Sequence, residues 1–269
     1  MALTLYVGDI HSDFLALERL VFAALSRLDV ERVVVVGDFG FFPDTHQDYW
    51  YQKSKLPIPV LFLDGNHDDH AALDHGSIAV PARKSLCFDA LHIPRGYCAD
   101  GVLYMGGATS FDREFTTQGI DWFPEENISD DDMTRARAQI ASHVGSIHTM
   151  VCHETTDGAF QVLRGGESDR NRARLEELFQ LVRPRLFIHG HHHRFRKYEY
   201  QGCTFVALRN LDHFHFEIIE ARDHDDLLRK TESCYLLSRQ ISFPDHSSTW
   251  GRSDLMCLAP SIQYRTDSS

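Results

Sequence analysis

The sequence predicts an α/β fold, and three stretches near the N-terminus carry that prediction. Leu3–Val7 and Arg32–Val36 are short apolar runs rich in β-branched residues, and each leads into a Gly-Asp pair. Between them, Ser12–Leu28 has the alternation of apolar and polar residues that is typical of an amphipathic helix. A strand, a helix and a second strand in this order form a βαβ unit, which places the two strands parallel in one sheet.

Later stretches repeat this alternation of strands and helices. Val60–Leu63 predicts a third strand, which ends in the polar loop 64–69. Further strands are predicted at Leu86–His92, Val102–Gly106, Ile147–Cys152, Leu186–His189, Thr204–Leu208 and Phe214–Ile219. Helices are expected over Asp130–Ser142 and Asp169–Val182, with Ser129 and Ser168 as their N-caps. Both helices are expected to cover a sheet.

The regular pattern predicts one domain followed by a tail. A chain of 269 residues is long enough to bury a core of ordinary density, and the pattern of strands and helices runs through residues 1–235. Residues 236–269 are mainly Ser, Pro, Asp and isolated apolar residues, so we expect a C-terminal tail there. No GxGxxG or GxxxxGK[ST] motif occurs, and a Gly-rich loop that cradles a nucleotide is therefore not expected.

The charge of the chain restricts its partners. The 39 acidic residues outnumber the 27 basic ones, and the formal net charge is -12. A general nucleic-acid binder needs a basic surface for phosphate contacts, so that class is not favoured. A small phosphorylated substrate stays compatible, because divalent metal ions can make one cleft positive inside an acidic protein.

The cysteines and the N-terminal sequence indicate a cytoplasmic protein. The six cysteines form no CxxC pair and no cluster, so neither a zinc ribbon nor a dense disulfide framework is expected. The N-terminal residues lack a basic segment ahead of an apolar one, and no run of about 18 apolar residues occurs anywhere. We therefore expect neither secretion nor membrane insertion.

Side chains suited to a metal site and to catalysis beside it follow the predicted strands one after another. They are Asp9, His11, Asp38, Asn66, His67, His153, His191 and His193. In an open α/β sheet the carboxyl ends of the strands meet at one edge, so these loops can form one cleft. Asp9 and His11 stand two apart, and an extended chain would point both side chains the same way. Imidazole together with carboxylate suits manganese, iron, nickel or zinc.

Each motif also has a simpler explanation. Asp9 and His11 could belong to an ordinary strand-end loop, and Asp38 is a common turn former. Asn66 and His67 could make a tight turn, and His153 alone is more often a structural histidine than a ligand. It is improbable that five loops carry these residues in this order by chance, so the combined pattern favours a metal site. For His189 and His192 we expect structural roles.

The order Asp-x-His, Gly-Asp, Gly-Asn-His-Asp, His, Gly-His-x-His resembles the calcineurin-like metallophosphoesterase superfamily over roughly residues 3 to 220. The resemblance implies a sandwich of mixed β-sheets flanked by helices, with the metal site at the carboxyl ends of the strands. It also implies that residues 1–235 form a catalytic domain. The implied reaction is the hydrolysis of a phosphate ester, a phosphomonoester or a phosphodiester, with two divalent metal ions. Manganese is favoured among these, with iron, zinc or nickel as alternatives.

The resemblance also implies a role for each residue. Asp9, His11 and His193 would hold the first metal, Asn66, His153 and His191 would hold the second, and Asp38 would bridge them. His67 would be the general acid beside the leaving group. A hydroxide between the metals would attack phosphorus, while the metals and Asn66 stabilise charge on the phosphoryl oxygens.

The loop around Asp38 distinguishes between branches of the superfamily. In phosphoprotein phosphatases this loop reads Gly-Asp-Tyr-Val-Asp-Arg-Gly, whereas here it reads Gly-Asp-Phe-Gly-Phe-Phe over residues 37–42. The second Asp and the Arg are missing, so a bacterial or phage-type branch is favoured over a serine/threonine protein phosphatase. Phe39, Phe41 and Phe42 could form an aromatic wall near the metals or fill the core, and we favour the core.

Arg113 is the candidate phosphate-binding residue. It ends the segment Gly106–Arg113, which with Asp121–Glu126 resembles a segment of bacterial and phage metallophosphoesterases. A guanidinium is planar and can bind phosphate through two hydrogen bonds. A surface ion pair with Asp112 is an equally good explanation for this arginine.

Two other functions stay open. A nuclease or RNA-end phosphatase is suggested by the basic residues Arg164, Arg170, Arg172, Arg174, Arg194, Arg196 and Lys197. A solvated helix face is the commoner explanation of such a cluster. The other alternative is an interaction scaffold that binds metal ions but catalyses no reaction. The presence of His67, the expected general acid, argues against this alternative. The expected partner is a phosphorylated small molecule or a nucleotide, with nucleic acid less favoured, and the sequence does not predict an oligomeric state.

Overall fold

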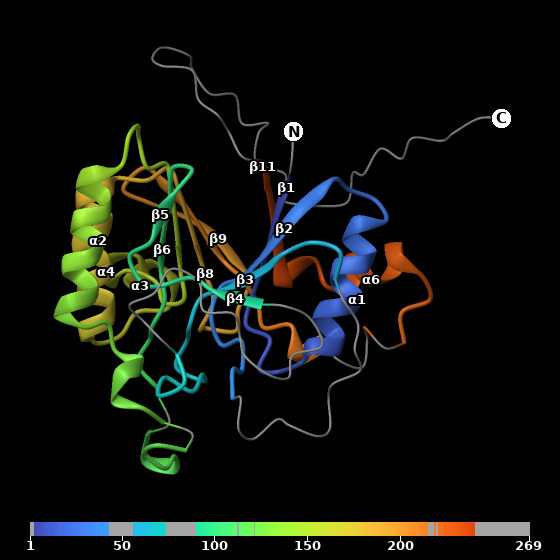
Figure 1. Cartoon of the computed structure of the whole chain (residues 1–269), viewed down its shortest axis with the longest axis horizontal. Coiled ribbons are helices and arrows are strands. Elements are labelled where there is room, and N and C mark those ends of the chain that lie inside the picture. The colour runs from blue at the N-terminus through green and yellow to red at the C-terminus, as the bar shows by residue number, and fades with distance from the viewer. Residues whose placement is uncertain are drawn as a thin grey trace.

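Two β-sheets pack face to face, and helices cover the outer face of each. The computed structural model describes residues 3–42, 56–73, 90–111, 113–120, 122–214, 218 and 220–239. In Figure 1, α2 and α4 lie on one side of the two sheets and α1 and α6 lie on the other. The fold is therefore a four-layered sandwich of helices, sheet, sheet and helices, which confirms the predicted class.

The first sheet has the strand order β11-β1-β2-β3-β4. Its strands are β1 (Leu3–Val7), β2 (Val30–Val35), β3 (Val60–Phe62), β4 (Ala90–His92) and β11 (Tyr235–Arg239). β1 to β4 are parallel, and β11 pairs antiparallel with β1 at the edge. The helices α1 (Phe14–Leu25) and α6 (His224–Lys230) belong to this half. One core packs α1 and α6 against the outer face of the sheet.

The second sheet has the strand order β5-β6-β7-β8-β10-β9. Its strands are β5 (Cys98–Ala99), β6 (Val102–Met105), β7 (Thr149–Cys152), β8 (Leu186–His189), β9 (Arg196–Tyr200) and β10 (Cys203–Ala207). The four central strands are parallel, and the two edge strands are antiparallel to their neighbours. The helices α2 (Asp130–Ser142), α3 (Asp157–Leu163) and α4 (Arg170–Val182) cover the outer face of this sheet. Short 3-10 helices are η1 (Arg113–Phe115), η2 (Pro124–Glu126), η3 (Asp212–Phe214) and η4 (Glu232–Cys234).

A third core joins the two sheets. Along β1, Leu5 and Val7 face α1, whereas Tyr6 between them faces the other sheet. Val34 and Ile188 meet in the same inter-sheet core. Since successive side chains of a strand point to opposite faces, a strand buried on both faces is apolar throughout, as β1 nearly is and as β2 is over residues 33–35.

Most predicted elements are confirmed within one or two residues. The stretches Leu3–Val7, Leu186–His189 and Asp130–Ser142 have the predicted bounds, and Ser129 caps α2 through a capping box with Asp132. Two predictions are wrong. Asp169, not Ser168, caps α4, because its carboxylate accepts from the backbone nitrogen of Arg172.

The second wrong prediction is the strand 214–219, since its described residues lie in no strand: Phe214 ends the 3-10 helix η3 and Ile218 is helical. Residues 215–217 and 219 lie outside the described residues. The segment 43–55 and the proposed tail beyond residue 239 lie outside the described residues. Just before that point, β11 adds residues 235–239 to the first sheet. Among the helices that the structure describes, none has the length and hydrophobicity required to cross a membrane.

Candidate metal centre

The loops after five strands bring the predicted ligands together. The loops that follow β1, β2 and β3 come from the first sheet, and those that follow β7 and β8 come from the second. Among the contacts that join the sheets here, Asp9 Oδ2 accepts from the backbone nitrogen of His191 at 2.9 Å, and His153 Nδ1 lies 3.0 Å from the carbonyl oxygen of Val36. The carboxyl ends of the parallel strands in both sheets therefore meet at one site.

A first cluster consists of Asp9, His11, Asp38 and His193, which offer ligand atoms within 4.8 Å of one another. The Nε2 atoms of His11 and His193 are 3.1 Å apart, and His193 Nε2 is 3.2 Å from Asp9 Oδ2. Two imidazole nitrogens and carboxylate oxygens aimed at one point form a donor set typical of a transition-metal ion.

A second cluster consists of Asp38, His153 and His191, again with ligand atoms within 4.8 Å of one another. His153 Nε2 lies 3.3 Å from Asp38 Oδ1 and 3.3 Å from the amide oxygen of Asn66. A backbone carbonyl can only accept, so His153 Nδ1 carries the proton and Nε2 is left as the ligand atom. Asp38 is the residue that the two clusters share.

Buried atoms of this site fit positively charged ions. Among the described residues, Asp9 Oδ1 and Asp38 Oδ2 are buried oxygens without a hydrogen-bond partner. A buried carboxylate oxygen without a partner is costly, unless a cation compensates the lost hydration. Since one such oxygen belongs to the first cluster and the other to the shared residue, the donor set fits a pair of metal ions.

The pKa values of the predicted ligand side chains fit a site that binds positively charged ions. Burial alone would raise the pKa of Asp38, but the neighbouring imidazole of His153 holds it well below its usual range. Burial alone would lower the pKa of His153, but Asp38 and Asp9 raise it to about 10. Burial lowers the pKa of His191 to about 3, so its ring is neutral at pH 7 and can donate a lone pair.

The backbone of the site is strained. Eight described residues other than glycine have a positive φ, and four of these are His11, Asp38, His191 and His193. Such backbone is unfavourable for side chains with a Cβ and is found preferentially at functional sites. The finding corrects the expected extended geometry of Asp9 and His11, whose side chains converge through a left-handed turn. Gly190 permits a close approach of the loop to Asp9, because a Cβ there would lie 2.0 Å from Asp9 Oδ1.

Polar side chains after β3 hold the loop that carries Asn66 and His67. Asp68 accepts from the backbone nitrogens of Phe41 at 2.7 Å and Gly65 at 2.8 Å. His70 Nε2 donates to the carbonyl oxygen of Gly65 at 2.8 Å. Asp38 Oδ1 accepts from the backbone nitrogen of His67 at 2.8 Å, and the half-buried ring of His67 lies 5.3 Å from that of His11. His67 is thus placed at the rim of the first cluster.

Glu154 is a site residue that the sequence did not reveal. It is fully buried next to His153, and His192 Nε2 lies 2.7 Å from one of its oxygens. Its other oxygen lies 3.6 Å from His191 Nε2 and 3.4 Å from Arg172 Nη1. The contact with His192 is a hydrogen bond, whereas 3.6 Å is too long for one to His191, so Glu154 lies behind His191 as a nearby negative charge. The supporting role expected for His192 agrees with this contact.

Arg113 binds an acidic partner in the structure. Its Nε and Nη2 donate to Glu126 Oε1 at 3.1 and 2.5 Å, and its guanidinium lies 4.9 Å from the ring centre of Trp122. Glu126 Oε2 accepts from Ser110 Oγ at 2.6 Å, and that hydroxyl accepts from Asn66 Nδ2 at 3.3 Å. A chain of hydrogen bonds therefore connects Arg113 with the metal centre.

Two of the three aromatic residues after Asp38 belong to the core. Phe39 is fully buried and stacks on Phe62 with ring centres 4.3 Å apart, and Phe41 packs in the same core. Phe42 is only half-buried. The aromatic side chain beside the second cluster is instead Phe111, whose ring stacks on His191 with centres 4.8 Å apart.

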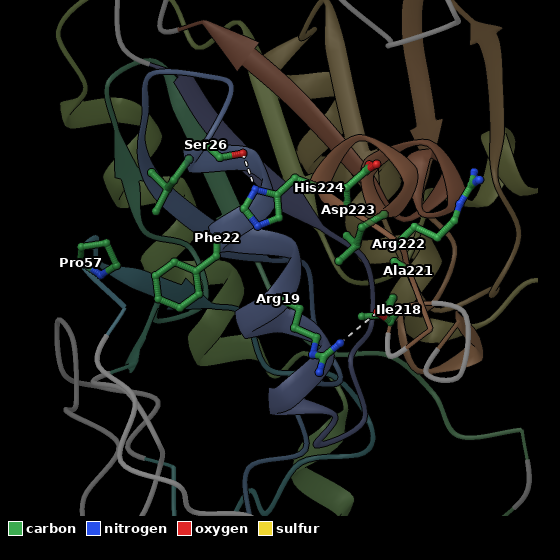
Figure 2. Close-up of a pocket in the computed structure, with 11 residues that line it drawn as sticks. Arg19, Phe22, Ser26, Pro57, Ile218, Ala221, Arg222, Asp223 and His224 are labelled. Atoms are coloured by element: carbon green, nitrogen blue, oxygen red, sulfur yellow. Dashed lines mark hydrogen bonds between the residues drawn. The ribbon is translucent and has the colours of Figure 1, made fainter.

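A groove of about 790 Å³ lies away from these loops, between α1 and α6. Phe22, Leu25 and Leu227 form part of its apolar lining. In Figure 2, His224 bonds to Ser26 on one side of the groove. The groove shares no residue with either metal cluster, so we do not assign it to the metal centre.

A comparison with protein families agrees with the fold. The profile of the calcineurin-like phosphoesterase family matches residues 3–195. Among solved structures, TT1561 of Thermus thermophilus is similar at 11% identity and a TM-score of 0.45, over 78% of this chain and 90% of that one. Phosphopantetheinyl hydrolase from Mycobacterium tuberculosis is similar at 12% identity and a TM-score of 0.41, over 83% and 94%. No curated protein sequence matches the chain.

Proposed function

Because the chain belongs to the calcineurin-like phosphoesterase family, we propose that it hydrolyses a phosphate ester with two divalent metal ions. The observation that carries this proposal is the position of Asp38, which belongs to both ligand clusters and keeps one buried oxygen without a hydrogen bond. A carboxylate shared between two sets of histidines is the arrangement that a dinuclear site requires.

Seven side chains would hold the metals. Asp9, His11 and His193 would bind the first ion, Asn66, His153 and His191 would bind the second, and Asp38 would bridge them. The mixed nitrogen and oxygen ligands favour manganese, with iron, zinc or nickel as alternatives. When bound, the two ions would lower the pKa of a water molecule and compensate negative charge on the phosphate.

The protein groups beside the ions would position the ester and move a proton. Asn66 Nδ2, which now donates to Ser110, would turn its donor to a phosphoryl oxygen and stabilise the charge that grows there. His67 would protonate the oxygen of the leaving alcohol. A half-buried imidazole at the rim can reach both the ester and solvent, so it can be protonated again after each turnover.

Arg113 remains our candidate for binding phosphate. Two of its nitrogens bind Glu126, so a contact with phosphate would use Nη1. The pairing with buried Glu126 would hold the guanidinium in place, while 42% of the arginine side chain stays exposed.

Three of the basic residues that suggested a nuclease, Arg170, Arg172 and Arg174, have acidic partners. Arg172 Nη1 lies 2.7 Å from Asp169, and Arg174 is paired with Asp130. These ion pairs reduce the positive charge available for nucleic acid, so we favour a phosphorylated small molecule or nucleotide. The nuclease or RNA-end phosphatase and the scaffold without turnover stay as alternatives for the experiment below to separate.

The remaining assignments are proposals of the same kind. We propose the bacterial and phage-type branch on the loop Gly37–Phe42. The expected division into a catalytic domain of residues 1–235 and a tail of 236–269 needs one correction, because residues 236–239 belong to β11, so we propose that the domain extends through Arg239. A cytoplasmic setting is supported by the buried free thiols of Cys152, Cys203 and Cys234, which suit a reducing compartment.

The first experiment compares two esters on protein loaded with manganese. Rates would be measured side by side for para-nitrophenyl phosphate and bis-para-nitrophenyl phosphate between about pH 6 and 9. A faster monoester indicates a phosphatase, and a faster diester indicates cyclic nucleotides, nucleic-acid ends or other diesters. No turnover of either ester would contradict the proposed hydrolysis and favour the scaffold.

A further inference from the structure

Phe111 is an exposed aromatic residue at the edge of the metal centre. Its ring stacks on His191 at an interplanar angle of 24°, and 62% of the residue is accessible to solvent. His192 lies next to it, with ring centres 6.3 Å apart. One face of the phenyl ring therefore covers a member of the second cluster, and the large exposed fraction leaves apolar surface open beside the place where a phosphate would bind.

The backbone that carries Phe111 is held in place. The preceding residue, Ser110, donates its backbone nitrogen and its hydroxyl to the two oxygens of buried Glu126, at 3.1 and 2.6 Å. The same hydroxyl accepts from Asn66 at 3.3 Å. The position of Phe111 is thus fixed relative to the second cluster, and a ligand that stacks on the ring gains contact area without ordering a loose loop.

We propose that Phe111 is a specificity-determining residue that stacks a planar base in the alcohol part of the substrate, which makes nucleotides the preferred phosphate esters. The inference rests on the proposed function and deepens it. Stacking on an aromatic side chain tolerates many bases, because each has a π-face. An acidic protein without a Gly-rich nucleotide loop would in this way recognise a nucleotide by its phosphate and its base.

The test compares adenosine 5′-monophosphate with ribose 5-phosphate. The two esters share the phosphate and the sugar and differ only in the base. For the manganese-loaded protein, we expect Phe111→Ala to lower kcat/KM for the nucleotide about tenfold, which is the size of one stacking interaction, and to change the value for ribose 5-phosphate little. Phe111→Trp should keep the preference, and Phe111→Leu, which is apolar but not planar, should lose it.

Phe115→Ala is the matched control, since Phe115 belongs to the same segment, is 82% exposed and should leave both rates unchanged. Equal losses for the two esters, or a lower manganese content of Phe111→Ala, would overturn the proposal, because Phe111 would then only shield His191. A calorimetric measurement of adenosine 5′-monophosphate binding distinguishes a failure of the proposed base site from a failure of the proposed ester hydrolysis. Phe111-dependent binding without hydrolysis of any ester would support the base site and contradict the phosphoesterase.

Discussion

The two ligand clusters differ in how far their side chains are exposed to solvent and in which other residues pack against them. In the first cluster the side chains of His11 and His193 are 21% and 43% exposed, whereas the side chain of His153 in the second is fully buried. The second cluster also has Glu154 behind it and Phe111 over it. We infer that the second cluster holds its ion more tightly and exchanges it more slowly, and that the first is the side at which solvent reaches the reaction.

The largest effect is expected from Asp38→Asn, which removes the carboxylate that both clusters share. The metal content should fall from two ions to fewer than one for each chain, and the rate by at least about 1000-fold, since under the proposed function the two ions would supply most of the catalysis. Metal analysis and ester hydrolysis measure the two effects. Asp225→Asn, in an exposed ion pair with Arg27, is the control. Loss of only one ion would show that Asp38 serves a single cluster.

A smaller effect, without loss of either metal, is expected from His67→Ala. The rate for a poor leaving group such as glycerol should fall about 100-fold, because the alcohol must be protonated as it departs. The loss for nitrophenolate should be much smaller, since it leaves without a proton. Glycerol phosphate and para-nitrophenyl phosphate would be compared on one preparation of known metal content. Equal losses on both esters would remove His67 from the role of acid.

Replacement of Glu154 should act on the second cluster alone. Glu154→Gln weakens the support of His191 and His192, and the affinity for the second ion should fall about 10- to 100-fold. Chelator competition would follow the two ions separately. Glu177→Gln, on the exposed side of α4, should change neither affinity. If Glu154→Gln lowered the affinity for both ions equally, the contacts of Glu154 would not explain the difference between the two clusters.

The fold could be predicted for those elements whose burial or helix capping leaves a clear pattern of residues in the sequence. β1 and β8 are apolar at nearly every position, and α2 has a complete capping box, so their bounds follow from the sequence. β9 was missed because it is an edge strand of the sequence Arg-Lys-Tyr-Glu-Tyr, in which only the central tyrosine is buried. The seven residues of α3 are too few for a helical period to be recognised.

The candidate site could be predicted as far as its residues follow strands. The predicted ligands end up together because parallel strands bring their carboxyl ends to one edge. Glu154 also follows a strand, β7, but its role could not be recognised from the sequence, since its partners Arg172 and His192 come from α4 and from the loop after β8. Phe111 was missed for a similar reason, because its contact with His191 joins two loops of the second sheet that are 80 residues apart in the sequence.

The last prediction concerns the proton that His153 of the second cluster carries. The raised pKa of His153, about 10, exceeds the unfolded value of about 6.5, so the ring of the metal-free protein is protonated at pH 7. An ion that binds there must displace this proton, and its apparent affinity should rise about tenfold for each pH unit between pH 7 and 9. Calorimetry in two buffers of different ionisation enthalpy would detect the released proton. Binding without proton release would contradict the assignment of His153 as a ligand.

The most direct test of a dinuclear centre bridged by Asp38 is the electron paramagnetic resonance spectrum of the protein with two equivalents of manganese. Two ions that share one carboxylate are magnetically coupled, so we predict the multiline signal of a coupled pair, and Asp38→Asn should abolish it. A spectrum of isolated manganese ions at full loading of the unaltered protein, or binding of a single ion, would contradict the account.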